Sequence, residues 1–160
     1  MQQRITPYLW FDGQAEEAAD RYVAIFRNSR ILHVQRYGEH GPGTPGTAMV
    51  VEFELDGLRF AALNGGPQYH FTEATSFHVP CETQDEVDEL WEKLTADGGE
   101  PGQCGWLKDR YGVSWQIVPT ELPKLLGGPD PDASGRALQA MFKMRKLDIQ
   151  ALRDAYDGKP

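Results

Sequence analysis

Two side chains that together could carry out acid–base chemistry fall within strand-like segments of this chain, His78 and Gln116. An imidazole can act as a general base near neutral pH, and an amide can orient that base or a bound ligand. We therefore take His78 and Gln116 as candidate catalytic residues. The alternative is an ordinary half-buried histidine that is hydrogen-bonded to its neighbours, and the residue types alone leave both interpretations open.

The strands that hold these side chains are indicated by alternating apolar residues at positions 75–80 and 113–118. In the first of them, alternation places Phe77 and Val79 against a helix. Ser76 and His78 then lie on the opposite face, which we expect to line a cleft.

The second strand forms a hairpin with residues 103–108 across a turn of four residues, 109–112. If this turn is regular, Trp106 pairs with Trp115 on the helix side. The cleft side then carries two pairs, Gly105 with Gln116 and Leu107 with Ser114. Because glycine has no side chain, Gly105 is expected to leave open space beside Gln116.

The first strand, residues 5–11, is apolar and aromatic nearly throughout. If the bulkier side chains pack on the helix, Tyr8 and Trp10 face inward, and Pro7 and Leu9 face the cleft. The candidate ligand pocket is the set of residues expected to face the cleft: Pro7, Leu9, Ser76, His78, Gly105, Leu107, Ser114 and Gln116.

The elements that position these residues repeat along the chain, which indicates an internal duplication. In the first half, a strand at 5–11 is followed by a helix at 15–26 and by strands at 29–37, 49–55 and 58–63. In the second half, a strand at 75–80 is followed by a helix at 84–96, which Thr83 begins as a capping box, and by the hairpin. Three short helices are expected at 122–126, 136–144 and 149–156, with Ser134 and Asp148 as N-caps.

The duplication predicts an α+β fold of two βαβββ modules, whose sheets join into one open, curved sheet with a concave cleft. Module one would span residues 1–66, module two 67–120, and a helical tail 121–160. We expect a single domain, because 160 residues are too few for two ordinary domains. Function is expected in the cleft.

Charge, apolar segments and cysteine content indicate which partners and which compartment to expect. With 24 acidic and 16 basic residues, the formal net charge of -8 disfavours nucleic acid. No segment resembles a secretory signal or a membrane span. The two cysteines, Cys81 and Cys104, are too few for a disulfide framework, so we expect a cytoplasmic protein with reduced, buried thiols.

Seven segments carry a resemblance to a known family: ITPYLWF at 5–11, NGGP at 64–67, CETQDEVD at 81–88, CGWLKD at 104–109, GVSWQIVP at 112–119, MFKM at 141–144 and KLDI at 146–149. Together they resemble the PhnB-like family, also catalogued as 3-demethylubiquinone-9 3-methyltransferase-like. That family is part of the vicinal oxygen chelate superfamily, with the glyoxalases, extradiol dioxygenases and bleomycin-resistance proteins. The resemblance implies the paired-module fold and a homodimer.

The resemblance also implies where a metal would bind, and there the chain departs from the superfamily. The positions that match the ligands of its metal-dependent enzymes are about Pro7, Ala61 or Ala62, Ser76 and Gln116. Proline and alanine side chains cannot ligate a metal, and a lone amide and hydroxyl hold a divalent ion poorly. We therefore expect neither a bound metal nor another cofactor.

Three functions remain open. The first is a protein that binds or transforms a small molecule in the cleft without a metal, and whether it is an enzyme stays undecided. The second is a non-catalytic protein that sequesters a cationic compound, which the net charge of -8 suits. The third, the methyltransferase of the family label, is the least supported, because no strand is followed by a glycine-rich loop that opens a helix.

Overall fold

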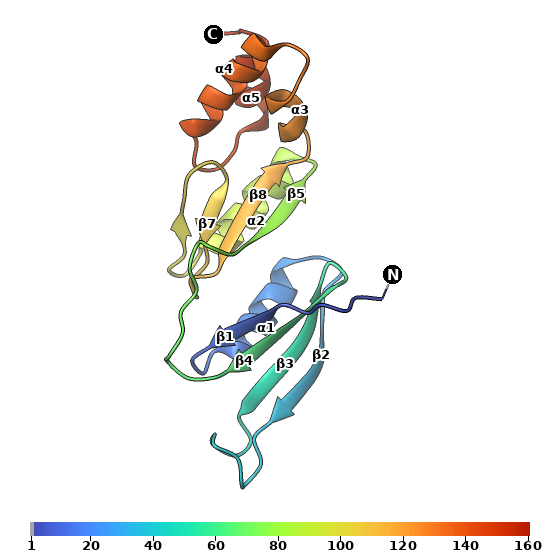
Figure 1. Cartoon of the computed structure of the whole chain (residues 1–160), viewed down its shortest axis with the longest axis vertical. Helices are drawn as coiled ribbons and strands as arrows, with labels where there is room; N and C mark the ends of the chain where they lie inside the picture. Colours follow the sequence, from blue (N-terminus) through green and yellow to red (C-terminus); the bar gives the residue numbers. More distant parts are fainter. Residues whose placement is uncertain (1) are drawn as a thin grey trace. The chain divides into compact units, whose positions relative to one another are not determined.

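A computed structural model describes residues 2–160 of the chain, which form two compact units. The first unit ends at His70, and the second runs from Phe71 to Pro160. Each unit contains one four-stranded mixed sheet and helices (Figure 1). The α+β class and the duplicated βαβββ modules are therefore confirmed, whereas the joining of the two sheets into one curved sheet stays a prediction.

The first unit is built from one helix and four strands: β1 (Tyr8–Phe11), α1 (Ala15–Ile25), β2 (Arg30–Arg36), β3 (Ala48–Leu55) and β4 (Leu58–Asn64). The strand order is β1-β4-β3-β2, with β1 parallel to β4 and the other neighbours antiparallel. Strands β3 and β4 meet at a turn in which Asp56 and Gly57 have φ of 47° and 81°. This left-handed pair is the conformation that a two-residue hairpin with Asp-Gly requires.

The core of the first unit lies between α1 and one face of the sheet. Tyr22 of α1 is fully buried and stacks on Phe53, with ring centroids 6.4 Å apart. On β1, Leu9 and Phe11 are buried, whereas Tyr8 is 59% exposed. The expected orientation of β1 is therefore wrong: Leu9, not Tyr8, lies on the helix side. All four side chains of this strand are apolar or aromatic, so alternation alone could not choose, and the tyrosine keeps its hydroxyl in water.

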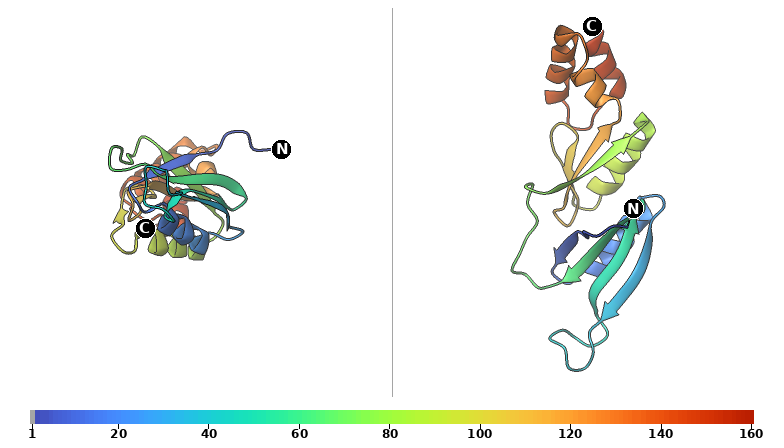
Figure 2. Two further views of the ribbon diagram at one scale, coloured as in Figure 1. Left: turned by 90° about the horizontal axis from the view of Figure 1, so that it is seen from below. Right: turned by 45° about the vertical axis from the view of Figure 1, so that its right-hand side comes forward.

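The second unit begins with a second module made of β5 (Ser76–Cys81), α2 (Gln84–Thr95), β6 (Glu100–Pro101), β7 (Trp106–Lys108) and β8 (Ser114–Pro119). Its strand order is β5-β8-β7-β6, with β5 parallel to β8. Thr83 begins α2 as predicted, because its side chain accepts a hydrogen bond from the Glu86 N–H at 3.2 Å. Helix α2 lies along one face of this sheet (Figure 2). Its buried side chains are Val87, Trp91 and Leu94.

Three helices complete the second unit: α3 (Leu122–Leu126), α4 (Pro131–Phe142) and α5 (Ile149–Tyr156). Asp148 caps α5 as predicted. The predicted start of α4 at Ser134 is wrong, because Asp130 caps the helix and Pro131 begins it. Proline suits the first helical position, where an N–H has no partner within the helix, and Ser134 instead accepts from the Gly128 N–H.

The tail helices pack on the end of the second sheet. Val118 of β8 forms a buried cluster with Leu122, Leu147 and Leu152. Gln84 of α2 holds the chain just before α5, since its amide donates to the Leu147 carbonyl and accepts from the Ile149 N–H. None of the helices in residues 2–160 combines the length and the apolar character that crossing a membrane requires.

Candidate functional site

The hairpin β7–β8 decides which side chains share a face of the second sheet. Trp106 pairs with Gln116, Leu107 with Trp115, and Lys108 with Ser114. The predicted pairing is therefore wrong by one residue. A slip of one residue turns every side chain of a strand to the other face. Leu107 consequently lies beside Trp115 on the face that α2 covers, and Trp106 lies beside Gln116 on the opposite face.

The cause of the slip is Asp109, which is 3% exposed. Its carboxylate accepts from the N–H groups of Tyr111 and Val113, and from the indole Nε1–H of Trp115 at 3.0 Å. The N–H of Asp109 also donates to the Val113 carbonyl. These bonds draw Val113 into the turn, so that five residues, 109–113, separate the paired Lys108 and Ser114.

We define the Gln116 face as the side of the second sheet that points away from α2. Paired and alternating positions place six side chains on it: Ser76, His78, Trp106, Lys108, Ser114 and Gln116. The amide Nε2 of Gln116 donates to Ser76 Oγ at 2.8 Å. His78 is paired with Gln116 and is exposed, so a molecule at this face can reach its imidazole.

Gly105 does not leave open space beside Gln116, contrary to the sequence-based expectation. It has φ of +85°, and a Cβ placed there would meet the Ile117 carbonyl oxygen at 2.8 Å and the Leu147 side chain at 3.0 Å. Its N–H donates to the Arg145 carbonyl. Gly105 is therefore the point where the tail packs closely on the hairpin, and its conformation is one that glycine adopts without strain.

A hollow of about 280 Å³ lies at the Ser114 end of the Gln116 face. The hollow is bordered by Trp106, Lys108, Ser114 and the short strand β6. Leu107 also borders it, but the Leu107 residue is only 1% exposed. Ser114 is also 1% exposed, and within residues 2–160 no group lies in hydrogen-bonding reach of its Oγ. Leaving a buried hydroxyl without a partner costs about 1–3 kcal/mol, so this atom needs an explanation.

Charges at the hollow are arranged around one ammonium group. Lys108 forms an ion pair with Glu73 and is paired across the strands with Glu100. The hydrogen bond to Glu73 raises the pKa of Lys108, and the negative charges of Glu73 and Glu100 add to this; the same bond lowers the pKa of Glu73. Lys108 and Glu73 are therefore held in their charged forms. With two acidic residues and one lysine, the lining has a formal net negative charge.

The other end of the Gln116 face is closed. Val118 follows Gln116 by two positions on β8 and is 8% exposed under the tail cluster. A ligand on this face is therefore confined to the stretch from Gln116 to Ser114. The cysteines lie outside that stretch: Cys81 is buried at the end of β5, and the Cys104 thiol is directed to the Met141 carbonyl.

The remaining pocket candidates, Pro7 and Leu9, belong to the first unit. Pro7 is half-buried, and its carbonyl accepts from the Ala61 N–H at 2.9 Å. Leu9 is buried beneath α1, as described above, so it does not line an open face.

The Asn64-Gly65-Gly66-Pro67 segment has a structural role in the first unit. Asn64 Oδ1 accepts from the Ala15 N–H at 2.9 Å and so caps α1, which lacks a side-chain cap of its own. The indole of Trp10 donates to the Gly66 carbonyl and covers Gly65 so closely that a Cβ there would lie 2.2 Å from the ring. The segment is therefore a tight turn that packs against Trp10.

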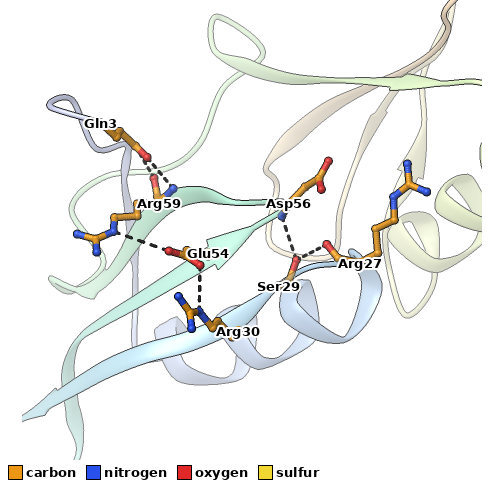
Figure 3. Close-up of polar contacts among 7 residues, drawn as sticks. All are labelled: Gln3, Arg27, Ser29, Arg30, Glu54, Asp56 and Arg59. Atoms are coloured by element: carbon orange, nitrogen blue, oxygen red, sulfur yellow. Dashed lines mark hydrogen bonds and ion pairs between the residues drawn. The ribbon is translucent and has the colours of Figure 1, made fainter. Parts of the chain in front are cut away.

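A second hollow of about 280 Å³ lies in the first unit, and the charged side chains that line it form polar contacts with one another or with neighbouring residues. Glu54 is flanked by Arg30 at 3.0 Å and Arg59 at 3.9 Å, and Gln3 bonds both backbone groups of Arg59 (Figure 3). Every charged group here has a partner, so the cluster joins the N-terminal segment to the ends of β3 and β4.

The residues present do not fit the superfamily's metal site. Ser76 and Gln116 are hydrogen-bonded to each other, and the matching positions in the first unit are a proline and a buried alanine. Within residues 2–160, no three His, Cys, Asp or Glu side chains lie close enough together to hold a metal ion.

Sequence reasoning missed two residues of the Gln116 face, Trp106 and Lys108, and the neighbouring Glu73. The signal that could have found the first two is Asp109 at the start of the turn. Aspartate at that position readily accepts backbone N–H groups two residues on and thereby lengthens a turn. Glu73 lies in a loop without regular pattern, so only the structure could place it.

Comparison with known proteins agrees with this fold. A family model described as 3-demethylubiquinone-9 3-methyltransferase matches residues 3–118, so the tail segments at 141–149 lie outside the match. A structure from Bacillus cereus, described as a candidate 3-demethylubiquinone-9 3-methyltransferase and PhnB protein, is 38% identical with a TM-score of 0.69. The likeness covers 74% of this chain and 100% of that one. No protein with a curated description matches the chain.

Two more distant structures share the fold alone. A protein from Pseudomonas aeruginosa is 19% identical with a TM-score of 0.61, over 74% of this chain and 98% of that one. The fosfomycin resistance protein FosX of Listeria monocytogenes, in complex with Mn(II) and sulfate, is 16% identical with a TM-score of 0.53, over 79% and 97%.

These likenesses show that the chain has the fold of the vicinal oxygen chelate proteins. Within that class, the chain belongs to the PhnB-like family, whose model carries the description 3-demethylubiquinone-9 3-methyltransferase. The resemblance read from the sequence is thereby confirmed.

Proposed function

We propose that this PhnB-like protein binds or transforms a small molecule on the Gln116 face, using neutral hydrogen-bonding side chains instead of the superfamily's metal site. The observation that carries the proposal is the buried Ser114 hydroxyl, which has no hydrogen-bond partner among residues 2–160 and lies on the same face as the Gln116–Ser76 pair. Three polar side chains and an exposed imidazole converge there, which is the arrangement expected of a small-molecule site.

The roles follow from this geometry. Gln116 is held by Ser76, so its carbonyl Oε1 has a fixed direction and can accept a hydrogen bond from a ligand. His78 is the candidate general base, since an exposed imidazole can accept a proton from a bound molecule near neutral pH. The protein would be cytoplasmic and a homodimer, and it would have no nucleic-acid partner.

A non-catalytic binding protein that sequesters a cationic compound is the second candidate. Its support is the net charge of -8 and the net negative lining of the hollow near Lys108. The methyltransferase of the family label has less support. The glycine-rich segment after β4 encloses Trp10 and opens no helix, so it offers no cradle for a nucleotide-like cofactor.

Native mass spectrometry of the purified protein tests the proposal, because it separates empty, metal-loaded and ligand-loaded forms. A ligand found in this way would then be titrated into the wild type, His78→Ala and Gln116→Ala, with His40→Ala from the exposed loop before β3 as the matched control. We expect both site variants to weaken binding about tenfold, the loss of roughly one well-formed hydrogen bond, and His40→Ala to leave it unchanged.

Incubation followed by mass analysis of the ligand separates the two candidates. A chemically altered ligand, with loss of turnover in His78→Ala, supports an enzyme. An unaltered ligand supports sequestration. Stoichiometric zinc, nickel, iron or manganese that is lost in Gln116→Ala would overturn the metal-independent site.

A further inference from the structure

The hollow at the Ser114 end of the Gln116 face has a mainly apolar lining with few polar groups. The indole of Trp106 and the ring of Pro101 border it. Aromatic side chains bind flat apolar molecules by stacking or edge contacts. The body of a fitting ligand is therefore flat and apolar.

The Ser114 hydroxyl indicates what polar group such a ligand would carry. Ser114 borders the hollow, and its hydroxyl is buried and has no hydrogen-bond partner within residues 2–160. A serine hydroxyl can donate one hydrogen bond and accept others. An oxygen on the ligand would accept the hydroxyl proton and satisfy the atom that the protein leaves unpaired.

The charges at the rim select against one class of ligand. Lys108 is occupied by Glu73, and Glu100 lies across from it on β6. Two carboxylates against one ammonium group repel an anion that enters the hollow. A carboxylate or phosphate group would also have to displace Glu73 from Lys108 before it could pair with the lysine.

We propose that this hollow binds an uncharged aromatic molecule that carries one hydrogen-bonding oxygen, with Trp106 against its ring and Ser114 donating to its oxygen. The proposal rests on the proposed function and names the class of ligand for the same face. It places the ring of the ligand between Trp106 and Pro101, toward the Ser114 end, with Gln116 and His78 beyond it along the face.

Titration with three matched probes, followed by two-dimensional NMR of backbone amides and indole N–H groups, tests this proposal. The probes are benzyl alcohol, toluene, which lacks the oxygen, and benzoate, which adds a negative charge. We expect benzyl alcohol to shift the Trp106 indole and the Lys108 and Ser114 amides, toluene to bind more weakly at the same place, and benzoate not to bind.

The variant Ser114→Ala gives the sharpest comparison, because it removes a hydroxyl that has no hydrogen-bond partner in the described part of the chain. It should weaken benzyl alcohol about threefold to tenfold and leave toluene unchanged, since only the alcohol has the oxygen. It should also keep or raise the melting temperature of the free protein. Ser29→Ala in the first unit is the matched control, and Trp106→Phe should retain part of the ring contact.

Three results would overturn the proposal: equal binding of benzoate, an unchanged affinity for benzyl alcohol in Ser114→Ala, or no shift at Trp106. A fall in melting temperature in Ser114→Ala would also count against it, because the hydroxyl would then have a structural partner. If benzyl alcohol shifts only the amide signals near His78 and Gln116, the proposed binding in this hollow is wrong, while the proposed function stands. If a ligand from native mass spectrometry binds independently of those two residues, the proposed function falls as well.

Discussion

Asp109 determines which side chains reach the Gln116 face. Its buried carboxylate accepts two backbone N–H groups and the Trp115 indole N–H, and these bonds lengthen the turn by one residue. Trp106 consequently faces away from α2 beside Gln116, while Leu107 is buried. A single polar residue in a turn thus determines which side chains of β7 belong to the candidate site.

Replacement of Asp109 by alanine should destabilise the protein strongly. The change leaves two N–H groups and an indole without their acceptor, and we expect the free energy of unfolding to fall by about 2–5 kcal/mol, from one to three buried bonds. Urea unfolding followed by tryptophan fluorescence measures the effect. The exposed Glu92→Ala on α2 is the control, and equal stability of the two variants would show that Asp109 does not hold the turn.

At the scale of elements, the sequence predicted the order of strands and helices because apolar periodicity and turn residues agree in each segment. The face of a strand was predicted well where alternation is clear, as for Phe77, which contacts the Trp115 ring with centroids 5.4 Å apart. It was predicted wrongly where every residue is apolar, as in β1, and where a side chain alters the turn, as in β7. The contact of Leu147 with Gly105 joins distant segments, so no local pattern could indicate it.

Gln84 should be needed to hold the tail on the second module. Its amide makes two bonds to the backbone around Asp148, one as donor and one as acceptor. Gln84→Glu replaces the donor by a carboxylate that repels the Leu147 carbonyl, so we expect a loss of about 1–3 kcal/mol. Faster hydrogen exchange of the Ile149 N–H would report the detachment. In Gln150→Ala, which changes the exposed side of α5, the Ile149 N–H should exchange as in the wild type. Identical exchange rates in the two variants would show that Gln84 does not hold the tail.

The attachment of the tail should also weaken in acid. The hydrogen bond from Lys146, followed by that from Gln84, lowers the pKa of the Asp88 carboxyl below its usual value. A lowered pKa in the folded state means that the stabilisation is complete above the pKa of the unfolded chain and is lost as the pH falls through the folded value. Asp88→Asn should therefore be less stable than wild type at pH 7, with the difference shrinking below about pH 4. Urea unfolding at both pH values checks this, and a difference that grows in acid would refute it.

At the scale of the whole molecule, the homodimer stays a prediction. Apolar side chains such as Ile5 and Tyr8 are 85% and 59% exposed, and exposed apolar groups favour association. Light scattering coupled to size exclusion should give about twice the 18.0 kDa of one chain. A mass of 18.0 kDa at all accessible concentrations would contradict the dimer.

The candidate site was predicted only in part from the sequence, for a reason that belongs to the whole molecule. Ser76, His78, Ser114 and Gln116 were expected on one face and do share it, because their strands alternate regularly. The sequence wrongly predicted the open space beside Gly105. Free space depends on what every other segment fills. The tail fills the space beside Gly105, whereas no group among residues 2–160 pairs with the Ser114 hydroxyl.

Mapping a bound ligand onto the backbone amides is the most direct test that the Gln116 face is the functional site. A small molecule identified by native mass spectrometry would be titrated into labelled wild type and into Gln116→Ala. We predict that the shifted amides lie in β5, β7 and β8 around Gln116, and that the shifts largely disappear in the variant. Shifts confined to α2, to the tail helices or to the first unit, unchanged in Gln116→Ala, would contradict the account.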